Sequence, residues 1–149
     1  MIQRKQTIYL LLALAAIIVC LCLPIGEVHL KSMGAAPVWY NIGVYTGEDF
    51  LAKPLPFVDL VVVGALTFID IFLYKRRQMQ MRICVAGIIL CLAWYGYYAF
   101  CAFGEFAAMG DFHFGFAACL PLVAIIFLFM ARHGIKADED LIKSMDRIR

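Results

Sequence analysis

Four stretches of this chain are long and apolar enough to cross a lipid bilayer as helices. A membrane helix needs about 20 predominantly apolar residues, because the hydrocarbon core is about 30 Å thick. The stretches cover residues 7–23, 55–74, 83–103 and 112–130 of the 149. Pro121 lies inside the fourth and should kink it, because proline cannot donate a hydrogen bond to the carbonyl of Ala117. The sequence therefore predicts an all-α membrane protein, a four-transmembrane-helix bundle forming one integral membrane domain over residues 1–149.

The composition excludes several other classes of protein. Hydrophobic residues make up 64% of the chain and charged residues 16%, whereas an ordinary soluble domain is about half apolar and about a quarter charged. A soluble globule and a disordered tail are therefore ruled out. The net charge of +2 is too small to attract polyanions by itself, so we expect no nucleic-acid partner.

The distribution of basic residues predicts the orientation, since cytoplasmic loops carry an excess of Lys and Arg. Of the 13 basic residues, only Lys31 and Lys53 fall on the side of the first loop, residues 24–54. The others share a side with both termini and the loop between the second and third stretches: Arg4, Lys5, Lys75, Arg76, Arg77, Arg82, Arg132, Lys136, Lys143, Arg147 and Arg149. Both termini should therefore be cytoplasmic. Bulky residues at 21–24, where a cleavage site would need small ones, make the first stretch an uncleaved anchor rather than a signal peptide.

The outer loop, residues 24–54, contains one segment typical of strands. Residues 38–46 are rich in β-branched and aromatic side chains, which predicts a short extracytoplasmic β-hairpin. Trp39, Tyr40 and Tyr45 collect where membrane proteins place interfacial anchors, and that is the simpler interpretation. A loop that binds a partner or a ligand is the alternative.

The tail, residues 131–149, predicts a separate cytoplasmic amphipathic helix. Apolar residues recur at helical spacing at Leu141, Ile142, Met145 and Ile148. Acidic residues fall at its expected start and basic ones near its end, which suits the helix dipole, and Glu139 can face Lys143 one turn later. Such a helix rests on the inner leaflet, or docks a cytoplasmic protein.

Asp59 and Asp70 are the most informative polar residues of the spans. Eleven residues apart, they lie within about 20° of each other on one helix face. An Asp at the centre of a membrane helix is costly and usually marks a function or a buried partner. Each lies only four residues from an end of the second stretch, however, so both can approach water. A structural or interfacial role is the simplest interpretation; a proton or cation path and contact with a partner subunit are the alternatives.

Cysteine and histidine give no strong chemical signature. The six cysteines lie within the stretches without a Cys-x-x-Cys pair, so we expect small hydrophobic roles and no disulfide. Glu27, His29, Glu105, Asp111 and His113 all face outward and are residue types that suit Zn²⁺, but solvated loops explain them more simply. Residues 94–100 form an aromatic sector, which we interpret as an interfacial belt with core packing. We predict no catalytic residue, no metal, no cofactor and no enzymatic activity.

The two ends of the chain resemble a known family. The start, residues 1–10 (MIQRKQTIYL), and the tail, residues 135–149 (IKADEDLIKSMDRIR), resemble small four-span proteins of Bacteroidota bacteria catalogued as domain of unknown function 4293. The resemblance implies a bacterial inner-membrane location and carries over no activity, cofactor or catalytic residue. Because Gln3, Arg4 and Gln6 lie on the same side as the tail, we expect the two ends to pack together and dock a partner. The candidate docking residues are Arg4, Asp138, Glu139, Asp146 and Arg147.

Two function classes remain. The first is a non-enzymatic scaffold, assembly or regulatory subunit of a membrane complex, with a membrane or cytoplasmic protein, or a second copy of the chain, as its partner in the lipid bilayer. The second is a small proton- or cation-linked transporter or channel component that uses the Asp59/Asp70 helix face.

Overall fold

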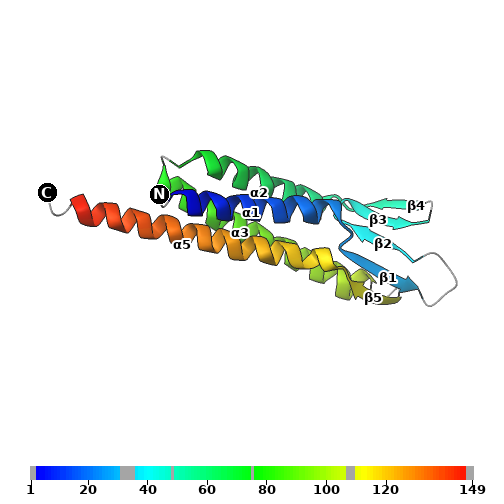
Figure 1. The fold of residues 1–149 in the computed structure, drawn as a ribbon. Coiled ribbons are helices and arrows are strands. Elements are labelled where there is room, and N and C mark those ends of the chain that lie inside the picture. The colour runs from blue at the N-terminus through cyan, green and yellow to red at the C-terminus, as the bar shows by residue number, and fades with distance from the viewer. Residues whose placement is uncertain (1–2, 31–35, 48, 75, 107–109, 147–149) are drawn as a thin grey trace.

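The computed structural model describes residues 3–30, 36–47, 49–74, 76–106 and 110–146. Four long helices run side by side, and a small sheet projects from one end of them (Figure 1). Both ends of the described chain, Gln3 and Asp146, lie at the opposite end. We call these two ends of the bundle the sheet end and the terminal end.

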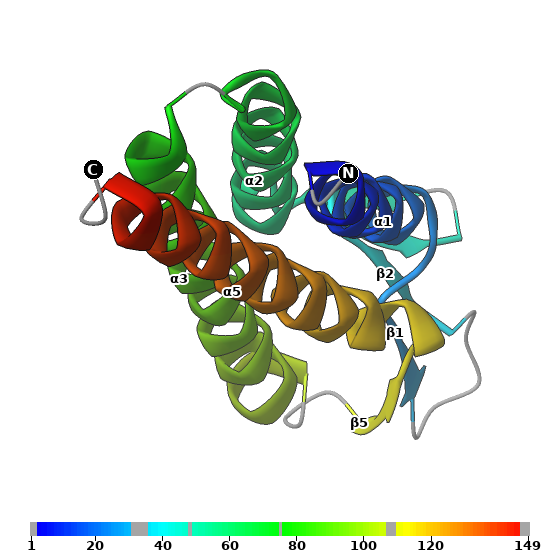
Figure 2. The same ribbon diagram turned by 60° about the vertical axis from the view of Figure 1, so that its left-hand side comes forward.

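The helices surround one continuous core. They are α1 (Gln3–Cys22), α2 (Leu55–Phe72), α3 (Arg77–Phe100) and α5 (Leu120–Asp146). A π-helical segment, η1 (Cys101–Phe106), continues α3, and a 3₁₀ turn, η2 (Phe116–Cys119), leads into α5. Both α1 and α3 pack against α2 and α5 (Figure 2). All four helices are long and apolar enough to span a membrane, as the sequence predicts.

The outward faces of the helices are apolar. Soluble monomers rarely expose continuous apolar patches of this extent, and lipid is the solvent that such a surface suits. The exposed large side chains on the four helices include Ile8, Leu11, Leu12, Val61, Val62, Ile89, Leu92, Ile126 and Phe129.

The fourth helix differs from its prediction at both ends. Phe112 belongs to a strand, and the helical segment begins only at Phe116. Pro121 is the second residue of α5, where the 3₁₀ turn η2 passes into the α-helix, so it lies at the start of the α-helix rather than in the middle of a span. The expected separate tail helix is also wrong, because α5 continues without a break to Asp146. A β-carbon at Gly134 would lie 3.2 Å from Cγ of Gln6, so this glycine serves close packing on α1 rather than ending the helix.

A five-stranded antiparallel sheet takes the place of the single predicted hairpin, so the protein is mostly helical rather than all-α. Its order is β4 (Asp49–Ala52), β3 (Gly43–Thr46), β2 (Val38–Tyr40), β1 (Gly26–Leu30) and β5 (Gly110–Phe114). The β2–β3 pair confirms the predicted hairpin, with Trp39 opposite Val44. β5 comes from the connection between the third and fourth spans and pairs with β1 in five residue pairs. In the sequence, the phenylalanines of β5 look like part of the fourth span. In the structure they alternate with polar residues along a strand.

Aromatic side chains join the sheet to the bundle. Trp39 of β2 is fully buried and stacks on Tyr98 of α3 with 5.0 Å between ring centroids, and Tyr98 stacks in turn on Trp94 at 5.1 Å. The Tyr98 hydroxyl donates a hydrogen bond of 2.7 Å to the carbonyl of Ile25. The aromatic sector of residues 94–100 therefore supplies core packing beneath the sheet more than an interfacial belt.

Candidate functional site

Asp70 is buried at the terminal end of the bundle. The buried face of α2 runs through Leu60, Val63, Thr67 and Asp70 at helical spacing, and Asp70 is 0% exposed. Its expected approach to water is therefore not seen, because α3 covers it. The Cys84 thiol donates a hydrogen bond of 3.1 Å to Oδ2 of Asp70, whereas Oδ1 is buried with no hydrogen-bond partner among the described residues.

Further polar side chains surround this carboxyl group. Gln80 is 5% exposed, and its amide donates a hydrogen bond of 3.2 Å to the main-chain carbonyl of Asp70. The Thr67 hydroxyl lies one turn away and donates to the carbonyl of Val63 at 2.8 Å. Spacing in the sequence singled out Asp70 but not Gln80 or Cys84, because their partner is on another helix.

Asp59 lies on the same helix near the sheet end. Eleven residues at the helical rise separate it from Asp70 by about 16 Å along the axis. Asp59 is half-buried, and its Oδ2 is buried without a hydrogen-bond partner in the described part of the chain. The two carboxyl groups thus share a face of α2, each with one unpaired oxygen, but they do not meet in one site.

The predicted packing of the N-terminal lead against the tail is present at the terminal end. The Gln6 amide of α1 donates a hydrogen bond to the Asp138 carboxyl group of α5, and both residues are 7% exposed. Glu139 forms the expected ion pair with Lys143 at 2.8 Å and accepts a longer bond of 3.4 Å from Gln78. These contacts hold α5 against α1 and α3.

Three candidate docking residues lie outside what the structure describes. Arg147 is not among the described residues, and the side chains of Arg4 and Asp146 are not described. Of the docking candidates, only Asp138 and Glu139 can therefore be placed, and both have partners within the chain.

Asn41 fixes the sheet to the bundle. It is 0% exposed in the β2–β3 turn, and its amide nitrogen donates to the carbonyl of Cys20 at 2.7 Å, at the end of α1. The indole N–H of Trp94 donates to Oδ1 of Asn41 at 3.1 Å. One side chain thus links the hairpin, α1 and α3. A lone amide within an aromatic and β-branched segment is the only sequence signal for this role.

Histidine and carboxylate side chains line the β1–β5 ladder. The register places Glu27 opposite His113 and His29 opposite Asp111, and the two imidazole rings meet edge to face with centroids 4.6 Å apart. Glu105 instead forms an ion pair with Lys53. No group of three or more His, Cys, Asp or Glu in the described ranges is arranged to hold a metal ion. All six cysteines are described, and each is a free thiol.

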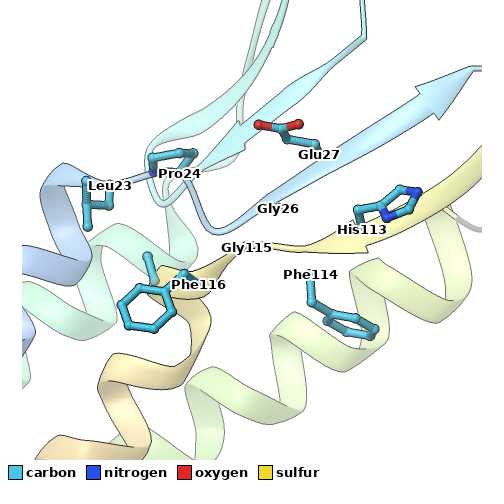
Figure 3. A pocket seen from close by; sticks show the side chains of 9 residues that line it. Leu23, Pro24, Gly26, Glu27, His113, Phe114, Gly115 and Phe116 are labelled. Carbon is cyan, nitrogen blue, oxygen red and sulfur yellow. The ribbon is translucent and has the colours of Figure 1, made fainter.

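A pocket of about 370 Å³ lies where α1 leads into β1 and β5 leads into η2. Figure 3 shows Gly26 and Gly115 on neighbouring backbones, with the Glu27 and His113 side chains on the strands beyond them. The amide of Gly115 donates to the carbonyl of Ile25 at 3.0 Å, and a β-carbon on Gly115 would lie 2.6 Å from the carbonyl carbon of Ile25. At this pocket two backbone segments approach each other closely, and its lining residues do not form a catalytic arrangement.

The outer edge of the sheet is exposed and partly apolar. Every residue of β4 is exposed, and the Phe50 and Leu51 side chains are 48% and 59% exposed. Next to it, an open groove of about 620 Å³ is lined by Leu21, Val38, Tyr40, Ile42, Tyr45 and Phe57. In the order of the described strands, β4 has a neighbour on one side only.

These features define a class of protein: a small helical protein with four candidate membrane spans and a five-stranded sheet at one end of its bundle. The chain belongs to the family described as Domain of unknown function (DUF4293), whose family model matches residues 2–148. The match covers nearly the whole chain and confirms the family named from its two ends. None of the curated proteins compared with the chain matches it.

Proposed function

We propose that this protein is a non-enzymatic scaffold or assembly subunit of a membrane complex, in which the four helices are the anchor and the free edge of the sheet binds a protein partner. The observation that carries the proposal is that β4 is an exposed strand at the edge of the sheet. An edge strand presents unpaired main-chain groups that can accept a further strand, and natural proteins usually protect such edges. Here the edge also exposes Phe50 and Leu51.

The orientation follows from charge and is part of the proposal. Both ends of the described chain and the turn between α2 and α3 lie at the terminal end, with eleven of the 13 basic residues assigned to that side. The positive-inside rule makes the terminal end cytoplasmic and the sheet extracytoplasmic. The family resemblance supports a bacterial inner membrane.

A protein partner suits β4 better than lipid does. The same sheet carries Glu27, His29, Asp49, Asp111 and His113, all of them exposed, and charged side chains keep a sheet out of the hydrocarbon. The apolar residues of β4 are therefore exposed to water. Strand addition to such an edge is a recurrent way of binding an extended peptide segment.

The test is co-purification of the tagged protein in a mild detergent. Leu51→Lys places a charge on the edge at an exposed position, so it should remove the partner and leave the fold intact. Leu141→Lys is the matched control, because Leu141 is 55% exposed at the terminal end. A partner retained by Leu51→Lys but lost from Leu141→Lys would contradict binding at the sheet and favour docking at the tail.

A second candidate function is proton or cation transport along α2. It is favoured by the unpaired oxygens of Asp59 and Asp70, because unpaired buried carboxyl oxygens are rare without a role. Reconstituted protein should then give a proton or cation flux that disappears in Asp59→Asn and Asp70→Asn. Flux equal to that of empty liposomes would exclude transport and leave the scaffold.

A further inference from the structure

A groove at the terminal end of the bundle carries an excess of positive charge. It lies between α3 and α5 and has a volume of about 530 Å³. Arg82 of α3 and Arg132 and Lys143 of α5 line it, against a single acidic residue, Glu139. None of the contacts described above makes use of Arg82 or Arg132.

The one carboxylate of the groove already has partners. Glu139 lies 2.8 Å from the ammonium of Lys143 and accepts a hydrogen bond from Gln78. Arg82 and Arg132 form no ion pair within the described residues. The groove is therefore complementary to an anion with several acceptor oxygens, which guanidinium groups bind with two parallel hydrogen bonds.

The remaining lining residues of the groove indicate what carries that anion. Met81 and Val85 follow Gln78 along the same helix towards the middle of the span, and both line the groove. The groove thus combines basic side chains with apolar ones in one wall. Free phosphate would leave Met81 and Val85 unused, whereas a phospholipid offers both an anionic headgroup and an acyl chain. Basic pockets between membrane helices are known to bind such headgroups.

We propose that the groove between α3 and α5 binds an anionic phospholipid, with Arg82 and Arg132 on its phosphate oxygens and Met81 and Val85 against its acyl chain. The simpler interpretation is that both arginines only extend to water at the end of a span, as long basic side chains do. If the groove binds the lipid, the affinity depends on where the two charges lie. If the arginines only extend to water, the affinity depends on the number of charges alone.

Native mass spectrometry of the full-length protein in detergent separates them. The probes are phosphatidylglycerol and phosphatidylcholine with identical acyl chains. The wild type should retain phosphatidylglycerol in preference to phosphatidylcholine. Arg82→Gln/Arg132→Gln should bind phosphatidylglycerol at least about tenfold more weakly. The variant loses two basic groups, and each basic group near an anionic lipid strengthens the binding by a similar factor. Lys5→Gln/Lys136→Gln removes the same charge at the same end outside the groove and should change binding by less than about twofold.

Three results would overturn the proposal: equal retention of the two lipids by the wild type, equal losses in the two double variants, and displacement of phosphatidylglycerol by millimolar inorganic phosphate. Arg82→Lys/Arg132→Lys keeps both charges and should retain most of the binding. If the glutamine variant fails to fold, the lipid preference of the wild type and of the lysine variant decides the question.

Discussion

At the scale of single residues, the buried amide of Asn41 holds the sheet on the bundle. Its side chain pairs with both Cys20 and Trp94. Asn41→Ala leaves the carbonyl of Cys20 and the indole N–H of Trp94 without that partner in the protein interior. We expect a loss of about 2–4 kcal/mol in the free energy of unfolding, measured by thermal or denaturant unfolding in detergent. Thr46→Ala, in the same hairpin but without a side-chain hydrogen bond among those described, is the control and should stay close to wild type. A stable Asn41→Ala variant would show that the sheet is held mainly by its aromatic stack.

At the scale of elements, the fold depends on one close crossing of two connections. Gly115 lies where β5 leads into η2, and a β-carbon there would lie 2.6 Å from the main chain of Ile25. Gly115→Ala should therefore displace β5 from β1 and destabilise the protein by about 1–3 kcal/mol, as overpacking against a rigid backbone does. Gly96→Ala is the matched control, because its β-carbon would meet nothing within 4 Å. Equal melting temperatures for the two variants would contradict the described crossing.

The helices and strands also show what the sequence could predict. Length and hydrophobicity were sufficient for the four helices, and β-branched and aromatic composition was sufficient for the β2–β3 hairpin. The same reasoning placed Phe112 in a helix, because the two phenylalanines of β5 lie directly beside an apolar span and look like part of it. The paired residues of β1 are 80 or more positions away in the sequence, and nothing local indicates such a pairing.

The candidate site was predictable only in part, for a related reason. Asp59 and Asp70 stand out because a carboxylate in an apolar run is conspicuous, and their shared face follows from helical geometry. The Gln6–Asp138 contact was anticipated as lead-to-tail packing, although not as this pair. Gln80 and Cys84 acquire their roles only from the way α3 covers α2. Asn41 likewise acquires its role only when the hairpin sits on α1 and α3. Contacts between different elements do not produce a periodic pattern of residues that a single sequence could reveal.

At the scale of the whole molecule, the structure divides the chain into a bundle with an apolar surface and a sheet with an open edge. Among the described residues of the bundle, several buried polar groups are hydrogen-bonded, whereas one carboxyl oxygen each of Asp59 and Asp70 has no partner. The sheet places exposed charged side chains on β1 and β5, and the exposed Phe50 and Leu51 beside Asp49 on β4. This division is why we assign anchoring to the helices and partner binding to the edge.

Site-specific photo-cross-linking in living cells tests that assignment most directly. A photoreactive residue at position 51 of β4 should give one discrete adduct heavier than the protein by the mass of its partner. The same residue at position 92, which is exposed on α3, should give no discrete protein adduct, because its neighbours are lipids. An adduct of twice the chain's mass at position 51 would contradict a separate partner and indicate a homo-oligomer. No protein adduct at position 51 would contradict the scaffold itself.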